Sequence, residues 1–532
     1  MKIGVKNKYL GAALLYIFII IAVYYAYLWR LDAAYLWRDE ATTACWAREM
    51  VQQESLIPKV WNGQQLIVQG PKGHDFNEDF TPGMQGWLQF YVAALSFKLF
   101  GVNTWTARIL FVLFGIAGLY ILYLIYKQLF TSHLFAILAG VLSMLSLPYI
   151  HFSRQGRYYA LVLFFSMVII YEITLWINGK QRHKVTSFII LFVSGAMLLL
   201  SNYFTFGLLW TAVICSLLLI RNKSFFPGLL AVTLPLGVMA LLLFTNLHGP
   251  FISRAEIGNL PYFSNYMTWL SLAYKRINQL FPVLPSFIVG IFLLWIYPKK
   301  TTEFRNVAIW FWMIIIITLF LGVLINKSNA FLRYYLYVIP LSLLLMVVYA
   351  NWIYKIFGVR LALAFFILMY GYHSMTSILN YSEAVTKRQF LNDTSYNEPM
   401  VEFLKQNVDK DETVAFIRNE KGMVAYFYIP DLKWVGLLEA QNPYNQKYKS
   451  LLPPAMFDDF DGVDWYVVWG MRGLPAKVEI GYELMWSYRY NQKKSRTDGQ
   501  PGSIQPNQYT ITQAEGGVGG DLCYFDFYRR IE

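Results

Sequence analysis

Long runs of apolar residues, separated by short polar segments, follow one another along most of this chain. A transmembrane α-helix needs about 20 apolar residues in succession, and eleven runs reach or approach that length. They lie near residues 9–29, 105–126, 134–150, 158–177, 186–201, 204–220, 226–246, 283–298, 306–325, 334–354 and 360–379. The first run is longer than the apolar core of a signal peptide and has no small-residue cleavage site after it, so we expect it to be retained. The pattern predicts a polytopic α-helical membrane protein with about eleven transmembrane helices.

Three outer regions interrupt or follow this pattern: residues 30–104, 247–282 and 380–532. Residues 30–104 form a long loop after the first span, and within it 87–100 is apolar but too short to cross a bilayer, which is typical of a helix at the membrane interface. Residues 380–532 are polar and rich in proline and glycine, with strand-like stretches such as 465–470. We therefore predict a transmembrane catalytic domain over 1–379 and a soluble extracytoplasmic α/β domain over 380–532.

Composition and charge agree with a membrane protein and suggest its orientation. Hydrophobic residues make up 57% of the chain and charged residues only 14%, whereas soluble domains carry about 25% charge. With the N-terminus in the cytoplasm, the short inner loops hold about fourteen Lys and Arg against about seven in the outer loops, which satisfies the positive-inside rule. The N-terminus is then cytoplasmic and the C-terminal domain lies outside the cytoplasmic membrane. The net charge of +13 is explained by these loops, and without a basic face or RNA-binding motif we expect contact with membrane lipids and not with nucleic acid.

Three cysteines add little chemistry. Cys45, Cys215 and Cys523 match no metal-binding spacing, and an odd number is not a disulfide framework. Cys45 and Cys523 both face outside in this topology, which permits a disulfide between them.

Two adjacent carboxylates follow the first span in the stretch WRDEATT. Asp39 and Glu40 are costly at a membrane boundary unless they are solvated, paired or used in chemistry. Neighbouring residues on a helix point about 100° apart, so the two do not form a paired-carboxylate site by themselves. One interpretation is a base facing a cavity, with Thr42 and Thr43 helping to fix the pair. The alternative is a solvated pair that caps a juxtamembrane helix.

A second group of polar residues lies further along the same loop. In GHDFNEDFTPG, His74, Asp75, Glu78 and Asp79 have side chains that bind divalent cations, and a metal site on His74, Asp75 and Asp79 is one interpretation. The group lacks the spacing of a known cation-binding loop. The alternative is a solvated turn before Pro82, so the only cofactor we consider is an optional divalent metal.

Arginines and tyrosines gather at the predicted outer ends of spans. Six are candidates: Arg108, Arg154, Arg157, Tyr158, Arg333 and Tyr334. The guanidinium is a forked, permanent cation suited to phosphate oxygens. A tyrosine can add a hydroxyl bond or belong to an interfacial aromatic belt. The alternative for the arginines is snorkelling to lipid headgroups.

These candidates share a chemical logic because all map to the outer boundary of the membrane. A carboxylate can accept a proton from an attacking hydroxyl, and arginines can stabilise a phosphate as it departs. A site at this depth suits a substrate whose tail stays in the bilayer and whose head is a phosphate. The pattern therefore favours a lipid-phosphate-linked donor.

The order of these features resembles the GT-C superfamily of membrane glycosyltransferases, in particular the bacterial branch similar to protein O-mannosyltransferases and lipid A aminoarabinose transferases. Asp39-Glu40 comes directly after the first span. It is followed by DFTPGMQGWLQFYVAALSFKLFGVNTWTARILFVLFG at 79–115, SRQGRYYAL at 153–161 and RYYLYVIPL at 333–341. The resemblance covers about residues 9–354 and implies a GT-C-like fold.

The resemblance implies an activity and roles for four residues. It implies an inverting transfer of a sugar from a polyprenyl-phosphate donor to a hydroxyl-bearing acceptor (a protein, glycan or lipid) outside the cytoplasmic membrane. Asp39 corresponds to the catalytic base and Glu40 to the residue that supports the base or the acceptor. Arg157 and Arg333 correspond to arginines that contact the donor phosphate.

The sequence also departs from that branch. Thr81-Pro82-Gly83 stands where relatives often have His-Pro-Pro or Lys-Pro-Pro, and Gln155-Gly156-Arg157 stands where many have Glu-Ala-Arg. A second carboxylate role is therefore in doubt. The alternative function is a transporter or flippase of lipid-linked sugars, and a further one is a catalytically silent membrane scaffold. A transporter predicts paired half-spans or charges at mid-bilayer, and few such charges occur.

Overall fold

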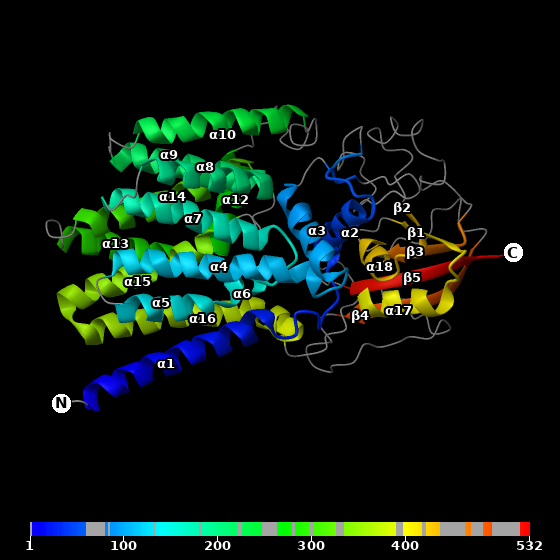
Figure 1. Ribbon diagram of the computed structural model, residues 1–532, viewed down its shortest axis with the longest axis horizontal. Coiled ribbons are helices and arrows are strands. Elements are labelled where there is room, and N and C mark those ends of the chain that lie inside the picture. Colours follow the sequence, from blue (N-terminus) through cyan, green and yellow to red (C-terminus); the bar gives the residue numbers. More distant parts are fainter. Residues whose placement is uncertain are drawn as a thin grey trace.

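The computed structural model contains a helical bundle and a smaller domain built on a sheet. It describes residues 3–59, 80–82, 86–130, 133–179, 184–220, 226–246, 263–278, 282–296, 302–325, 335–389, 397–417, 422–436, 463–469, 482–491 and 522–531. The bundle occupies one end of the elongated molecule and the sheet the other (Figure 1). Helices α2 (Arg38–Gln52) and α3 (Leu88–Phe100) lie between them (Figure 1).

The helices of the bundle coincide with the predicted spans. They are α1 (Ile3–Val23) continued by the π-helix η1 (Tyr24–Leu28), α4 (Thr106–Leu129), α5 (His133–Met144), α6 (Leu147–Ser153), α7 (Tyr159–Ile177), α8 (Lys184–Ser201), α9 (Tyr203–Ile220), α10 (Phe226–Asn246), α13 (Val283–Ile296), α14 (Thr302–Ile325), α15 (Val338–Phe357) and α16 (Val359–Gln389). A further helix, α12 (Phe263–Asn278), packs against α14. The predicted interfacial stretch forms α3, which ends where Gly101 adopts a positive φ of 78°.

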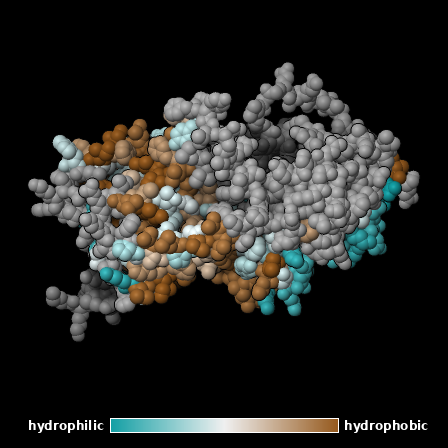
Figure 2. Space-filling view, turned by 90° about the horizontal axis from the view of Figure 1, so that it is seen from above, coloured by the Kyte–Doolittle hydropathy of each residue, from teal (hydrophilic) through white to brown (hydrophobic). Residues whose placement is uncertain are grey.

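The surface of the bundle is that of an integral membrane protein. Within the described part of the chain, five helices are long and apolar enough to cross a membrane on length and composition: α4, α7, α8, α15 and α16. Large apolar side chains are exposed on the bundle, and Figure 2 shows them gathered over its end of the molecule. Apolar surface of this extent requires apolar surroundings.

The third predicted span is broken into α5 and α6, which the apolar pattern did not reveal. Pro148 has no N–H to offer the carbonyl of Met144. The Tyr27 hydroxyl donates to that carbonyl at 2.9 Å, and the Tyr370 hydroxyl donates to the Leu142 carbonyl at 3.0 Å. These bonds satisfy backbone oxygens that the apolar interior of a membrane would leave without donors. The break directs α6 toward the turn that carries the predicted arginines.

The C-terminal domain is a small α/β unit, as predicted. Its elements are α17 (Asn397–Asn407), β1 (Thr413–Ile417), α18 (Gly422–Tyr428), β2 (Lys433–Gly436), β3 (Trp465–Trp469), β4 (Tyr482–Asn491) and β5 (Leu522–Arg530). The sheet order is β2-β1-β3-β5-β4. β1 runs parallel to β2 and β3, whereas β5 is antiparallel to β3 and β4. Helix α18 lies on the side of this domain that faces α2, and it packs against α2.

Two expectations differ from the structure in detail. Helix α16 continues to Gln389, so the predicted domain boundary at 380 falls inside a helix. Cys45 is a free, buried cysteine whose thiol donates to the carbonyl of Met423 at 3.2 Å. The disulfide that the topology permitted is therefore not formed, because Cys45 faces α18.

Candidate active site

The first turn of α2 carries both predicted carboxylates. The helix begins at Arg38, after Trp37 in an extended conformation. Asp39 is 4% exposed and Glu40 only 1%. The helix dipole favours carboxylates in a first turn, but burial to this degree requires partners as well. The alternative of a solvated, capping pair is right in one part only: Glu40 does cap the helix by accepting the Trp37 N–H, but neither side chain is solvated.

Glu40 is held by a bidentate ion pair with Arg108 from α4. The Arg108 Nε donates to Glu40 Oε1 at 3.1 Å, and Nη2 donates to Oε2 at 2.8 Å. The remaining guanidinium N–H groups donate to the carbonyls of Leu31 at 2.7 Å, Ala34 at 2.9 Å and Tyr35 at 3.2 Å. All five donors of Arg108 thus bind protein oxygens. Here Arg108 holds Glu40 and the chain before α2, which differs from the phosphate-binding role predicted from its position.

Gly156 also binds Glu40. Its N–H donates to Glu40 Oε1 at 2.7 Å, and the Trp37 N–H donates to Oε2 at 3.3 Å. A Cβ at position 156 would lie 2.5 Å from the carbonyl oxygen of Ala107. Only glycine therefore fits this close approach, which accounts for Gly156 and leaves Gln155 without a structural explanation.

Asp39 faces Arg157, which lies in the turn between α6 and α7. The Arg157 Nη2 is 3.7 Å from Asp39 Oδ2, a charge contact longer than a hydrogen bond. The other amino group, Nη1, donates to the Asp39 carbonyl at 3.1 Å and to Thr43 Oγ1 at 3.0 Å. The guanidinium also lies 5.5 Å from the centre of the Tyr158 ring. A buried carboxylate and a buried permanent cation thus share one site.

Thr43 and Gln89 connect this site to α3. The Thr43 hydroxyl lies 3.2 Å from the Asp39 carbonyl and 3.3 Å from Gln89 Oε1. The Gln89 amide donates to the carbonyl of Gly86 at 3.0 Å. Thr43 was anticipated as a residue that fixes the carboxylates, but Gln89 was missed because a lone glutamine on an interfacial helix carries no distinguishing sequence signal.

Arg154 has a different environment from Arg157. Its Nη2 donates to the carbonyls of Trp29 at 3.1 Å and Arg30 at 3.2 Å, which ties the turn after α6 to the end of η1. Beside it, the Gln155 amide lies 2.9 Å from the His151 ring nitrogen Nε2. Arg154 therefore positions the turn in which Arg157 lies.

The C-terminal half of α2 is covered by α18 of the C-terminal domain. Arg48 donates to the carbonyls of Tyr426 at 3.0 Å and Phe427 at 3.3 Å, and the Tyr426 hydroxyl donates to Glu49 Oε1 at 2.7 Å. Burial raises the pKa of the Cys45 thiol to about 12, consistent with a dry interface. This docking was missed because residues so far apart in the sequence show no pattern that would pair them.

Several predicted site residues lie outside the described part of the chain. Arg333 and Tyr334 are among them, as are the metal candidates His74, Asp75 and Asp79. Among the residues that the structure does describe, no group of three or more His, Cys, Asp or Glu is arranged to hold a metal ion. The second phosphate contact and the metal site remain predictions.

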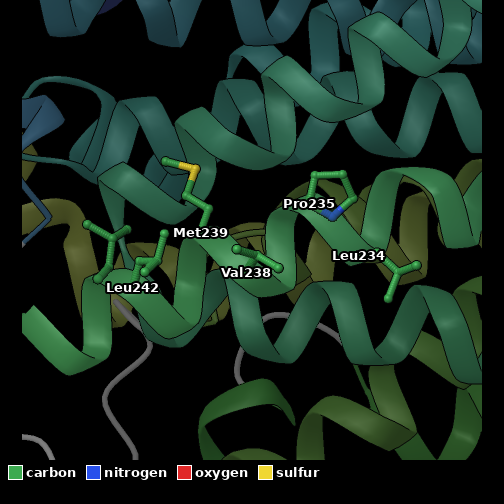
Figure 3. A pocket seen from close by; sticks show the side chains of 6 residues that line it. Leu234, Pro235, Val238, Met239 and Leu242 are labelled. Carbon is green, nitrogen blue, oxygen red and sulfur yellow. The ribbon is translucent and has the colours of Figure 1, made fainter.

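An apolar groove on α10 is unrelated to these residues. It has a volume of about 600 Å³. Its lining, part of which Figure 3 labels, consists of Leu234, Pro235, Val238, Met239, Leu242 and Leu243. None of these side chains can transfer a proton or bind a phosphate.

Comparisons with known proteins agree with the GT-C resemblance. Residues 85–248 match the family described as dolichyl-phosphate-mannose-protein mannosyltransferase. No curated protein matches the chain.

Two solved structures share the fold of almost the whole chain. The crystal structure of ArnT from Cupriavidus metallidurans bound to undecaprenyl phosphate is 15% identical, covers 86% of this chain and 93% of its own, and has a TM-score of 0.54. The apo structure of the same protein is 13% identical, covers 87% and 93%, and has a TM-score of 0.55. At such identities the likeness establishes the fold alone. Together with the family match, it confirms the predicted resemblance and the GT-C-like fold.

Proposed function

We propose that this chain, which has the fold of the GT-C membrane glycosyltransferases, moves a sugar from a polyprenyl-phosphate donor to a hydroxyl-bearing acceptor with inversion of configuration. One observation carries the proposal. Asp39 is buried 3.7 Å from the guanidinium of Arg157, where the apolar bundle meets the α/β domain. This contact supports the proposal, because a general base and a phosphate contact would have to lie side by side where a lipid-linked phosphate can reach both.

Asp39 acts as the general base in this scheme. The acceptor oxygen attacks the anomeric carbon from the face opposite the phosphate, and the Asp39 carboxylate takes the hydroxyl proton. The bond between the anomeric carbon and the phosphate oxygen breaks, and its electron pair leaves with the phosphate. Because the pKa of a hydroxyl is far above 7, the proton moves as the new bond forms. Arg108 and the Gly156 N–H hold the Glu40 carboxylate, which fixes the helical turn that also carries Asp39. Glu40 supports Asp39 in this way.

Arg157 stabilises the charge that develops on the leaving phosphate. Its hydrogen bonds to the Asp39 carbonyl and to Thr43 fix the plane of the guanidinium before substrate arrives. Arg333 is proposed as the second phosphate contact, with Tyr158 and Tyr334 beside the two arginines. Arg154 keeps the Arg157 turn in place through backbone carbonyls.

The donor class is proposed by analogy, and the location of the site is proposed from the charge distribution. A similar fold was crystallised with undecaprenyl phosphate, which supports a polyprenyl-phosphate donor here. The distribution of Lys and Arg supports a site on the outer face of the cytoplasmic membrane. The donor sugar and the acceptor class (protein, glycan or lipid) depend on contacts that fold analogy does not supply.

A donor-release assay tests the proposal. Purified protein in lipid nanodiscs is offered a panel of polyprenyl-phosphate sugars with a mixture of hydroxyl acceptors, and released polyprenyl phosphate is measured. Asp39→Asn should lower release by about 100-fold or more, the scale of a lost general base. Asp32→Asn is the matched control, because Asp32 is an exposed acid of the same segment, and it should release at the wild-type rate.

Two outcomes would contradict the scheme. An Asp39→Asn variant that releases polyprenyl phosphate as fast as wild type would remove the base role. A wild-type protein that releases none from any donor, yet carries lipid-linked sugars across a bilayer, would establish the transporter alternative instead.

A further inference from the structure

Tyr428, the last residue of α18, reaches from the C-terminal domain to the chain around the proposed site. Its ring stacks on Tyr35, with centroids 4.1 Å apart and planes 19° apart. Its hydroxyl accepts the Leu36 N–H at 2.9 Å and lies 2.9 Å from Thr104 Oγ1. The bond to Thr104 joins two hydroxyl groups, and either of them can be its donor. Tyr428 therefore bridges two segments that are distant in the sequence.

These two segments are the ones that carry the Glu40–Arg108 ion pair. Leu36 precedes Glu40 by four residues, and Thr104 precedes Arg108 by four. The Tyr428 bridge and the bidentate ion pair are thus two successive braces between the same segments, four residues apart along each of them. Asp39 lies on the segment that both braces hold.

We propose that Tyr428 is a positioning residue, through which the C-terminal domain sets the orientation of the first turn of α2 and so directs Asp39 toward Arg157. The proposal rests on the proposed function. Tyr428 acts through Leu36 and Thr104, to which its hydroxyl is bound, and not on the reacting atoms.

The Tyr428 bridge depends on one oxygen atom, the Tyr428 hydroxyl, because its partner Leu36 is buried. Leu36 is 0% exposed, so no solvent replaces the hydroxyl as acceptor for its N–H. A buried N–H without an acceptor is costly, and the segment before α2 would shift to find another one. Displacement of a catalytic group by about 1 Å costs up to about 100-fold in rate. Tyr428→Phe keeps the ring and its stack on Tyr35, so it removes only the bridge.

Tyr426 offers a matched control on the same helix. Its hydroxyl donates to Glu49 Oε1 at 2.7 Å, near the opposite end of α2 from Asp39. Tyr426→Phe removes the same chemical group from the same domain interface. A loss that arises from weaker docking alone would appear in both variants, whereas a loss of positioning would appear in Tyr428→Phe only.

The experiment uses the full chain in lipid nanodiscs with the donor found in the release assay. The kcat is expressed per donor-binding molecule, which excludes misfolded protein from the count. In Tyr428→Phe, kcat should fall by about tenfold or more with the donor KM within about twofold of wild type, because only the geometry of the base changes. Backbone amide exchange over residues 31–43 should become faster. In Tyr426→Phe, kcat and the exchange of 31–43 should remain at wild-type values.

Thr104→Val tests the second half of the bridge. It removes the Thr104 hydroxyl that bonds to Tyr428 but leaves the bond from Leu36, so the loss of kcat should be smaller than in Tyr428→Phe. The double variant should be no slower than Tyr428→Phe, because both substitutions remove one bridge. Additive losses would show two separate effects and would contradict the bridge.

Other results overturn the proposal. A Tyr428→Phe variant with wild-type kcat, or equal losses in the Tyr426 and Tyr428 variants, would remove the positioning role. If the wild-type protein releases polyprenyl phosphate from no donor, the proposed function fails, and amide exchange decides the brace separately. Faster exchange of 31–43 confined to Tyr428→Phe would then support the brace, and unchanged exchange would refute it.

Discussion

Glu40→Gln is expected to damage the fold, whereas the same change at the neighbouring Asp39 is expected to damage the reaction. The Glu40 carboxylate accepts two bonds from Arg108, one from the Gly156 N–H and one from the Trp37 N–H. A glutamine has one carbonyl oxygen, and its amide group would meet a donor on the other side. The substitution also leaves the Arg108 cation buried without its counter-charge.

The structure gives the size of the effect. Arg108 is 2% exposed and Glu40 is 1% exposed. Breaking a buried pair by removing one charge costs about 3–5 kcal/mol. Asp39→Asn should cost less, about 1–2 kcal/mol, because Arg157 keeps its hydrogen bonds to a carbonyl and to Thr43.

Thermal unfolding and donor release separate the two variants. The apparent melting temperature, followed by size-exclusion chromatography in one detergent, should fall clearly for Glu40→Gln and little for Asp39→Asn. The Glu40→Gln molecules that remain folded should retain part of the release activity. Adding Arg108→Met should recover only part of the stability, because Met cannot donate to the carbonyls of Leu31 and Ala34. Wild-type stability in Glu40→Gln would refute the argument that this ion pair holds the segment before α2.

Two further predictions concern the surroundings of the site. Gly156→Ala places a Cβ 2.5 Å from the Ala107 carbonyl oxygen and should destabilise the protein by about 1–3 kcal/mol. The measurement is a lower melting temperature. The control is Gly237→Ala, which has open space around its Cβ and should not lower the melting temperature. Burial raises the pKa of Cys45 to about 12, so its thiol should stay protonated and unmodified by maleimide at pH 8 in the folded protein. Because the folded pKa lies above the ordinary value of 9.0, the Cys45 contribution to stability should be lost as the pH rises from about 9 to about 12, and rapid modification at pH 8 would contradict the burial.

The transmembrane architecture was predictable because it depends on consecutive residues. Each apolar run coincides with one or two helices, and the alternation at 465–470 identified β3. The break between α5 and α6 was not predictable from hydropathy, because it depends on donors that come from Tyr27 in η1 and Tyr370 in α16. Those donors are far away in the sequence, and only packing brings them to the freed carbonyls.

The sequence predicted the charged residues of the candidate site, but not the residues that hold them in place. Asp39, Glu40 and Arg157 stood out because charges at a membrane boundary require an explanation. Gln89 and Tyr428 did not, since a glutamine on an interfacial helix and a tyrosine in a soluble domain are ordinary. Their importance comes from contacts with chain segments that their own sequence neighbourhood does not indicate.

By itself the sequence determined that this chain enters a membrane many times and places acids and arginines at the ends of its spans. Crossing a bilayer requires about 20 consecutive apolar residues, and such a run can be recognised in the sequence alone. Only the tertiary structure decided which carboxylate pairs with which arginine. Asp39 and Glu40 are adjacent but point about 100° apart on α2. The folded chain therefore offers one of them to Arg157 and the other to Arg108, and a sequence cannot show which cation lies on which side of a helix.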